Sequence, residues 1–264
     1  MSYRDGWAAL NLEMPGNVPR TEYSLAEYHF PMMRRVTGID VTEKSDAETK
    51  RRARRAMREA LGDEVDLLIE AHDRFTVSTA IRLGKQLEEF RPFWLETPVR
   101  SYDLKGHIEV QRALNFPVVL GEAFHELRQF AELLHERVID IVQPEPQHLG
   151  PSTARKAFAV ADAYDALVAC HQAQSPFCTA MNAHLHCSIP NFLIQENFDD
   201  SLEPWTWDLL QGVPRVEDGY IVPSDAPGWG VEFNEEEALK HPYGERNFLR
   251  LFEEGWETRR PPTS

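Results

Sequence analysis

Positive charge is scarce in this sequence, cysteine is rare, and no long apolar run is present. Its 28 lysines and arginines face 43 aspartates and glutamates, and the net charge of −15 argues against a nucleic-acid-binding surface and for a soluble protein. No apolar stretch approaches the roughly 20 residues that a membrane span needs, and no signal peptide is recognisable at the start. The 3 cysteines, an odd number, fit a reducing compartment. We therefore expect a cytoplasmic protein that binds neither nucleic acid nor membranes.

Three short apolar runs each end in a glutamate, and these glutamates are spaced 26 residues apart, at positions 70, 96 and 122. Such a run is typical of a strand buried on both faces, as in a parallel sheet covered by helices. About 26 residues accommodate one strand, one helix and two short loops, so each carboxylate is expected to end its own βα unit. Because neighbouring parallel strands lie about 4.8 Å apart, the three carboxylates converge. Carboxylates that close repel one another unless a cation neutralises them, and an all-oxygen site favours Mg²⁺.

The same arrangement continues along the chain, because Glu145, His171 and Glu196 follow the next three apolar runs. Strands that alternate with helices predict a parallel sheet, and polar groups at successive strand ends are typical of an α/β (β/α)₈ TIM barrel. The expected strands are 7–13, 66–70, 93–95, 118–121, 138–142, 166–170 and 191–195. The expected helices run from Ser45 to Leu61 and over 77–90, 102–114, 126–136 and 152–164, with a short helix before the last strand.

Six short motifs coincide with these strand ends: Ile69-Glu70-Ala71-His72, Phe93-Trp94-Leu95-Glu96-Thr97-Pro98, Gly121-Glu122, Gln143-Pro144-Glu145, Cys170-His171 and Pro190-Asn191-Phe192-Leu193-Ile194-Gln195-Glu196. Each is weak alone, but together they resemble the barrel domain of the enolase superfamily, in its mandelate racemase/muconate lactonizing subgroup. The resemblance runs from Trp7 to the end of the chain and includes a late signature at 227–231. It is strongest to acid-sugar dehydratases of the galactonate dehydratase type.

The resemblance implies a Mg²⁺-dependent hydro-lyase that acts on a small sugar acid, an aldonate. Such an enzyme removes the proton α to the carboxylate and eliminates the β-hydroxyl, which gives a 2-keto-3-deoxy acid. A histidine suits the base because its ordinary pKa lies near neutral pH, and a cation stabilises the charge that develops when the weakly acidic proton leaves. The resemblance implies a homo-oligomer and assigns metal binding to Glu70, Glu96 and Glu122, the base to His171, its carboxylate partner to Glu145, the general acid to His72 and substrate polarisation to Glu196.

Several positions depart from the family pattern. Relatives usually carry aspartate where Glu70 and Glu145 stand, and a second glutamate where Thr97 stands. The longer Glu70 would move the ion by something on the order of an ångström, and errors of that size are costly in catalysis. The segment Leu10–Glu13 contains no lysine, which argues against racemisation, because that reaction needs a base on each face of the substrate.

Two stretches near the beginning admit more than one interpretation. Residues 14–44 are irregular, and a loop of this length is either functional or disordered; leaving the sheet beside the carboxylates, it would serve as a lid. Within it, Tyr23, Tyr28 and His29 offer an alternative base, as a loop tyrosine does in related mannonate dehydratases. The basic run from Lys50 to Arg55 suggests a nucleic-acid patch, but on so acidic a chain we interpret it as a solvated helix face.

Chain length is the largest departure from the family. We count seven strands where a closed barrel needs eight. We expect a barrel domain over 1–200, with strands 2–8 of the family barrel, and a C-terminal extension over 201–264 that packs on the barrel or on a capping domain. The first barrel strand and the N-terminal capping domain are expected to be absent, so that the chain is either a fragment or is completed by a partner. Two functional alternatives stay open: a truncated, non-catalytic homologue, and a racemase or cycloisomerase.

The remaining histidines and cysteines are assigned to packing or to support of the site. The sequence His184-Leu185-His186-Cys187, together with Cys178, suggests zinc, but residues two apart do not share a helix face, so we disfavour a zinc site. The other members of this group are His125, His148, Cys170 and Cys187.

Overall fold

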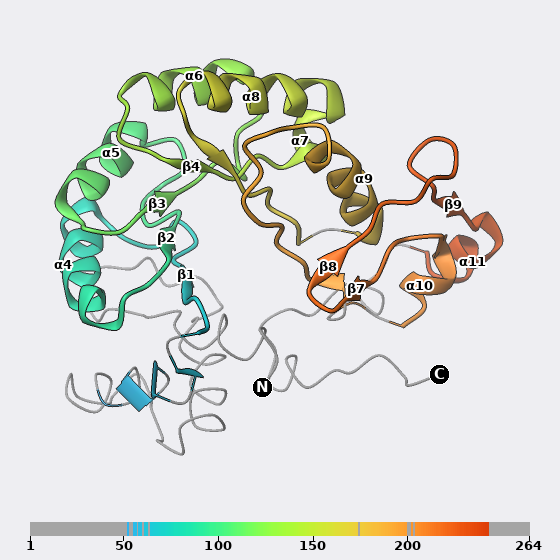
Figure 1. Cartoon of the computed structure of the whole chain (residues 1–264), viewed down its shortest axis with the longest axis horizontal. Helices are drawn as coiled ribbons and strands as arrows, with labels where there is room; N and C mark the ends of the chain where they lie inside the picture. Colours follow the sequence, from blue (N-terminus) through green and yellow to red (C-terminus); the bar gives the residue numbers. More distant parts are fainter. Residues whose placement is uncertain are drawn as a thin grey trace. The chain divides into compact units, whose positions relative to one another are not determined.

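The structure, a computed structural model, describes residues 64–173, 175–199 and 204–242, with Leu202 and some positions between 52 and 62 (Figure 1). The expected strand at 7–13, the stretch 14–44 with its tyrosines and most of the helix expected from Ser45 lie outside the described residues. The chain forms two compact units. Among the described residues, the first unit holds those up to Leu120 together with Glu136–Ile141, and the second holds Gly121–His135 and those from Val142 to Pro242.

A three-stranded parallel sheet is the centre of the first unit. Its order is β1 (Leu68–Glu70), β2 (Trp94–Glu96) and β3 (Val118–Val119). Every residue of these strands is buried, as the continuous apolar runs predicted. The register pairs Glu70 with Glu96, so these two glutamates are neighbours at the carboxyl edge of the sheet.

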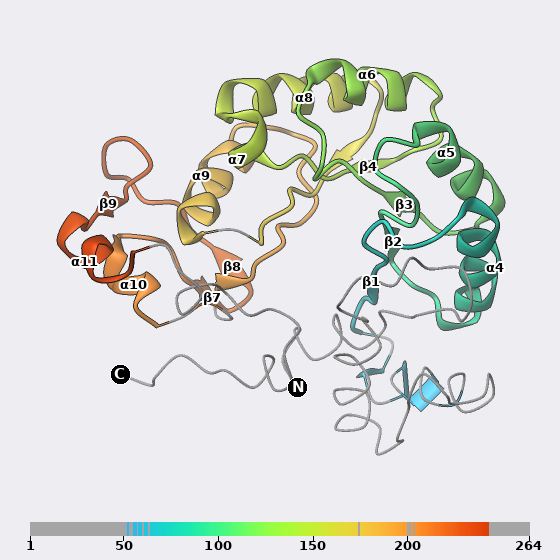
Figure 2. The same cartoon turned by 180° about the vertical axis from the view of Figure 1, so that it is seen from behind.

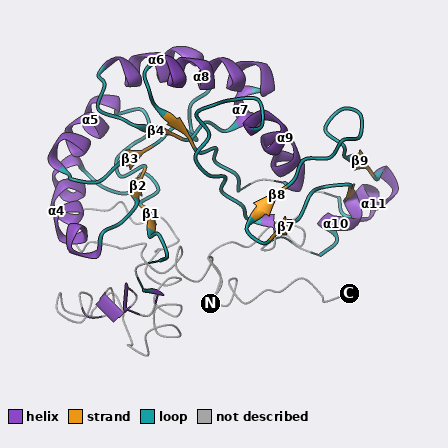
Figure 3. Ribbon diagram, in the orientation of Figure 1, coloured by secondary structure: helices purple, strands orange, loops and turns teal. Residues whose placement is uncertain are grey.

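Two helices connect these strands and lie along the same side of the sheet (Figures 1 and 3). Helix α4 (Val77–Leu87) begins where the Thr76 side chain accepts a hydrogen bond from the Thr79 amide, and the 3₁₀ turn η2 (Glu88–Phe90) follows it. Helix α5 (Leu104–Ala113) begins at Asp103, whose carboxylate accepts the Gly106 amide. Such caps satisfy amide groups that have no partner inside the helix.

The second unit continues the alternation of helix and strand. Helices α6 (Leu127–His135) and α8 (Pro151–Ala163) lie side by side (Figures 1 and 2). Strand β4 (Ile141–Val142) pairs with β5 (Leu167–Val168), and the short helix α7 (Pro146–Leu149) lies between β4 and α8 in the chain. Helix α9 (Pro176–His186) is the short helix expected before the last strand.

The expected strand at 191–195 is too long. Among the described residues it is reduced to one parallel bridge between Val168 and Phe192, with the Leu193 amide donating to the Val168 carbonyl at 2.9 Å. Of the other strands expected within the described residues, the one at 93–95 is found one residue later, at 94–96, and the rest are shortened to two or three residues. In this part of the chain the strands form two separate sheets, β1–β2–β3 and β4–β5. The sequence had predicted one continuous sheet.

Beyond residue 200 the described chain forms short elements that the sequence did not indicate. They are α10 (Thr206–Leu209), β6 (Leu210–Gln211), β7 (Val216–Glu217), β8 (Tyr220–Ile221), β9 (Glu232–Phe233) and α11 (Glu235–Lys240). Strands β6 and β9 pair antiparallel, as do β7 and β8. The division into a barrel domain over 1–200 and an extension over 201–264 stays a prediction. No described helix has the length and apolar character needed to cross a bilayer.

Candidate active site

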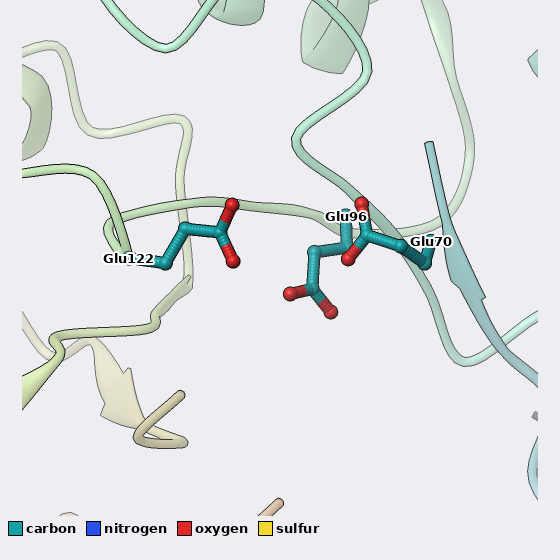
Figure 4. A group of neighbouring side chains, drawn as sticks. All are labelled: Glu70, Glu96 and Glu122. Atoms are coloured by element: carbon teal, nitrogen blue, oxygen red, sulfur yellow. The ribbon is translucent and has the colours of Figure 1, made fainter. Parts of the chain in front are cut away.

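Three carboxylates gather where the sequence predicted a metal site. Glu70 ends β1, Glu96 ends β2, and Glu122 stands three residues beyond the end of β3. One carboxylate oxygen from each residue lies within 4.8 Å of those of the other two (Figure 4). Among the described residues, this is the group of acids, histidines and cysteines whose spacing could hold a metal ion.

The surroundings of these carboxylates fit a hard divalent cation. Glu96 is 1% exposed, and its Oε1 is buried without a hydrogen-bond partner among the described residues. A buried, unpartnered carboxylate oxygen is costly, and neighbouring anions add repulsion. Glu70 Oε1 does accept a hydrogen bond from the His72 amide. An all-oxygen donor set of three carboxylates suits Mg²⁺ better than the softer transition metals.

The loops after β1 and β2 hold the first two glutamates in place. Thr97, directly after Glu96, is fully buried and has a φ of 37°, an uncommon conformation for a residue with a side chain. Its amide donates to the Val119 carbonyl at 2.9 Å, and its carbonyl accepts the Asp73 amide at 2.9 Å. Ser101 in turn donates its hydroxyl to Asp73 at 2.6 Å. The Thr97 backbone thus joins strand β3 to the turn that follows β1.

His171 lies among carboxylates, as predicted for the base. It follows the segment that contains β5, and its Nδ1 is 2.8 Å from Oε2 of Glu145. Because a carboxylate accepts a hydrogen bond, Nδ1 carries the proton in this pair. The other ring nitrogen, Nε2, lies 3.1 Å from Glu122 Oε2 and 3.9 Å from Glu196 Oε2. The two ring nitrogens thus face different carboxylates: Nδ1 faces the buried Glu145, and Nε2 faces a member of the three-glutamate group.

Glu145 is fully buried and held on both of its oxygens. It caps α7, and its Oε1 accepts the Gln147 amide at 2.9 Å. The same oxygen accepts the thiol of Cys178 at 3.3 Å, while Oε2 accepts from His171. The sequence identified Glu145 but not its contact with Cys178, which depends on how α9 is placed.

Glu196 is held by a buried polar network that sequence reasoning missed. Its Oε2 accepts the backbone amide of Gln172 at 2.8 Å. The Gln172 side chain donates to Thr179 and, at 2.7 Å, to Asp199. Asn197 donates to the other oxygen of Asp199 at 3.0 Å, and burial raises the pKa of that acid. No sequence pattern indicated these contacts, because they join residues before α9 to residues after it.

His72 is exposed, and its backbone, not its ring, contacts Glu70. It has a φ of 48° and stands in the turn after β1. In the described part of the chain, no contact joins its imidazole to the other predicted site residues. Its assignment as the general acid therefore stays a prediction.

The residues that suggested a zinc site make other contacts. On α9, the His184 ring lies 5.8 Å from Trp229, whereas the His186 ring stacks on Phe192 at 4.3 Å. Cys187 is exposed, and Cys178 contacts Glu145.

The other two histidines reserved for packing or support lie together. The rings of His125 and His148 are 5.4 Å apart, and His148 Nδ1 is 3.2 Å from the Glu122 carbonyl oxygen. That contact places His148 behind a predicted metal ligand, as a support for its backbone.

Comparison with known proteins shows the family to which this fold belongs. The family model described as "Enolase C-terminal domain-like" matches residues 21–238. The D-gluconate/D-galactonate dehydratase of Picrophilus torridus is 37% identical over 181 residues, which are 68% of this chain and 46% of that protein. A D-mannonate dehydratase of Caulobacter sp. strain K31 is 36% identical over 191 residues, 71% of this chain and 47% of that protein. The chain thus spans about half the length of the curated relatives it matches.

Solved structures match at a similar level. An enolase from Pantoea ananatis with bound D-gluconate and Mg has a TM-score of 0.69 and 30% identity, and the match covers 76% of this chain and 49% of that one. A mandelate racemase/muconate lactonizing enzyme-like protein from Roseovarius sp. TM1035 has a TM-score of 0.71 and 30% identity, and the match covers 94% of this chain and 70% of that one.

Proposed function

The chain belongs to the enolase superfamily, in its mandelate racemase/muconate lactonizing subgroup, and from this we propose that it is a Mg²⁺-dependent acid-sugar dehydratase. The fold class expected from the sequence, a (β/α)₈-type TIM barrel like the enolase C-terminal domain, is confirmed by the same matches. The proposed reaction removes the proton α to a carboxylate and eliminates the β-hydroxyl as water. Its product is a 2-keto-3-deoxy acid.

One observation carries the proposal: His171 lies between Glu145 and Glu122. Its Nδ1 is 2.8 Å from the buried carboxylate of Glu145, and its Nε2 is 3.1 Å from Glu122. A histidine that is oriented at Nδ1 by a buried carboxylate and exchanges a proton at Nε2 is the usual arrangement of a general base. Glu196 Oε2 lies 3.9 Å from the same nitrogen, Nε2, that faces Glu122.

The proton transfer follows from these positions. The α C–H bond breaks, its electron pair stays on the substrate, and the proton goes to His171 Nε2. Glu145 holds the Nδ1 proton throughout and stabilises the imidazolium that forms. Because Glu145 is fully buried, its charge acts on His171 with little screening by water. Glu196, held by the Gln172 amide, is placed to polarise the substrate.

Glu70, Glu96 and Glu122 would hold Mg²⁺, which would stabilise negative charge on the substrate carboxylate. The electron pair then forms a Cα–Cβ double bond as the β C–O bond breaks, and the hydroxyl leaves as water with a proton from an acid. The resulting enol gains a proton at Cβ and loses its hydroxyl proton, which gives the 2-keto-3-deoxy acid. We assign the acid to His72, two residues beyond the ligand Glu70. The segment Leu10–Glu13 offers no lysine as a second base, which favours a one-base elimination over a two-base racemisation.

The substrate class is proposed from the relatives. Proteins that match this chain are named D-gluconate, D-galactonate and D-mannonate dehydratases, and one similar structure contains D-gluconate and Mg. We therefore propose an aldonate as substrate. A homo-oligomeric state and a cytoplasmic location stay predictions.

The test is a direct assay of the purified chain. Mg²⁺ and D-gluconate, D-galactonate or D-mannonate are supplied in turn, and the 2-keto acid product is measured as its semicarbazone. The same reaction in D₂O, followed by NMR, reports exchange of the α proton. We expect product and exchange with at least one aldonate, and neither with His171→Asn. Absence of both with every aldonate would favour the non-catalytic homologue.

A further inference from the structure

A thiol makes one of the contacts that fix the buried carboxylate of Glu145. Oε1 of Glu145 accepts two hydrogen bonds, from the Gln147 amide at 2.9 Å and from the Cys178 thiol at 3.3 Å. Its other oxygen faces His171 Nδ1 at 2.8 Å. A carboxylate with no access to water depends on such partners, because an unmet acceptor in the interior is costly.

The position of Cys178 favours a donor role. It lies in the first turn of α9, where its amide donates to the Ser175 carbonyl at 2.9 Å, and its side chain is fully buried. Burial, and after it the nearby charge of Glu145, raises the pKa of the thiol, so the sulfur keeps its proton. A protonated thiol beside a carboxylate can only donate.

A glutamate carboxylate needs more restraint than the shorter aspartate carboxylate would. Its extra methylene adds a torsion, and the rotamers that this torsion allows would carry Oε2 away from His171. The Gln147 amide restrains Oε1 from the backbone of α7, and the thiol restrains the same oxygen from α9. Two restraints from different helices define the direction of the whole carboxylate group.

We propose that Cys178 is a positioning residue for the Glu145–His171 pair: its thiol orients the Glu145 carboxylate so that Oε2 receives the Nδ1 proton of His171. The assignment rests on the proposed function in one respect, since the kinetic consequence requires His171 to be the base. The alternative is that Cys178 only fills space.

Two substitutions separate these roles. Cys178→Ser keeps a donor and loses volume, whereas Cys178→Val keeps volume and loses the donor. Because a thiol is a weak donor, we expect Cys178→Val to lower kcat about tenfold with little change in KM. Cys178→Ser should stay within about threefold of the unsubstituted chain. The same pair of changes at Cys187, which is exposed at the end of the same helix, is the matched control and should leave kcat unchanged.

A second measurement needs no turnover. Proton–nitrogen NMR of histidine-labelled protein in saturating Mg²⁺ reports the hydrogen-bonded Nδ1 proton of His171, assigned by its loss in His171→Asn. We expect this resonance in the unsubstituted chain and in Cys178→Ser, and its loss or a large upfield shift in Cys178→Val. If Cys178→Val does not fold cooperatively, Cys178→Ala takes its place. An inactive chain with this NMR pattern would refute the proposed function and leave the positioning role intact.

Three results would overturn the proposal. The first is an unchanged Nδ1 resonance in Cys178→Val, and the second is loss of the resonance in Cys178→Ser. The third is absence of the resonance from the unsubstituted chain, because there would then be no oriented pair for the thiol to support.

Discussion

Glu70 and Glu96 are register partners at the carboxyl ends of neighbouring parallel strands. Adjacent strands hold their Cα atoms about 4.8 Å apart, so the backbone itself forces the two carboxylates together. Both residues are buried, and Glu122 completes the group. The sheet therefore fixes the repulsion between these carboxylates. This repulsion should determine both the Mg²⁺ affinity and the stability of the metal-free protein.

We predict that Glu96→Gln weakens Mg²⁺ binding by at least about tenfold, because it removes one of three anionic ligands. Isothermal titration calorimetry measures the affinity. Glu109→Gln, on the exposed face of α5, is the control and should bind Mg²⁺ like the unsubstituted chain. An unchanged affinity in Glu96→Gln would mean that the three glutamates do not form the site.

The same substitution should have the opposite effect on the metal-free protein. Without a cation, Glu96→Gln relieves repulsion between carboxylates whose oxygens lie within 4.8 Å of one another. We expect its free energy of unfolding in EDTA to exceed that of the unsubstituted chain by on the order of 1 kcal/mol. Urea denaturation with and without Mg²⁺ measures both values. A lower stability in EDTA would contradict the repulsion argument.

The two predicted catalytic histidines should separate by isotope exchange. His171→Asn should abolish both dehydration and exchange of the α proton with solvent deuterium, because it removes the base. His72→Asn should abolish dehydration and leave exchange measurable, since proton abstraction does not require the hydroxyl to leave. NMR in D₂O follows both reactions, and His135→Asn, at an exposed position at the end of α6, is the control.

Two outcomes would redirect these assignments. Exchange that survives His171→Asn would transfer the role of base to another residue, with Tyr23, Tyr28 and His29 first in line. Native exchange and dehydration in His72→Asn would remove His72 from the mechanism.

His186 should make stability depend on pH. Burial lowers its pKa from 6.5 to about 4, so the folded protein resists protonation that the unfolded chain accepts. Its contribution to stability is complete above about pH 6.5 and is lost as the pH falls toward 4, by up to roughly 3 kcal/mol. His186→Phe, which can still stack on Phe192, should reduce the loss of stability between pH 7 and pH 4.5. Urea denaturation at the two pH values measures this; an equal loss in both proteins would show that His186 titrates normally.

Asn191 should be important for stability. Its side-chain amide donates to the buried carbonyls of Ala166, at 2.9 Å, and Phe158, at 3.3 Å. Asn191→Leu leaves both carbonyls without this donor, and we expect a loss of about 2 kcal/mol. Asn115→Leu at an exposed position should change stability by less than about 0.5 kcal/mol. Thermal and urea unfolding measure both, and equal effects would remove the special role of Asn191.

The sequence predicted the ends of the strands better than their lengths. A carboxylate after an apolar run marks a strand end, because the side chain must leave the core there, and this placed Glu70 and Glu96 at the ends of β1 and β2, whereas His171 stands three residues past β5. Glu122 stands three residues past β3, not at its end. Gly121, with a φ of 140°, precedes it, and a Cβ at this glycine would lie 3.0 Å from the Gln143 backbone. The close approach of Gly121 to the Gln143 backbone depends on how two distant segments pack, so the sequence around Gly121 does not reveal it.

The hydrogen bonds that hold the site residues in place could not be predicted, because they join residues far apart in the sequence. The contact of Cys178 with Glu145 joins residues 33 positions apart and depends on the rotation of α9 about its axis. Asp199 meets Gln172 across 27 positions. Periodicity indicates which face of a helix is apolar, but it does not indicate which polar side chain a particular helix turn will meet.

The capping role of Glu145 limits what substitution can achieve at this position. The same carboxylate that faces His171 also begins α7 by accepting the Gln147 amide. Aspartate is a strong helix cap, but its shorter side chain would have to choose between the helix amide and the imidazole. A Glu145→Asp substitution that kept both contacts would therefore require α7 and the imidazole to shift together. The single substitution alone would lose one of the two contacts. The start of α7 therefore constrains which acid can stand at position 145.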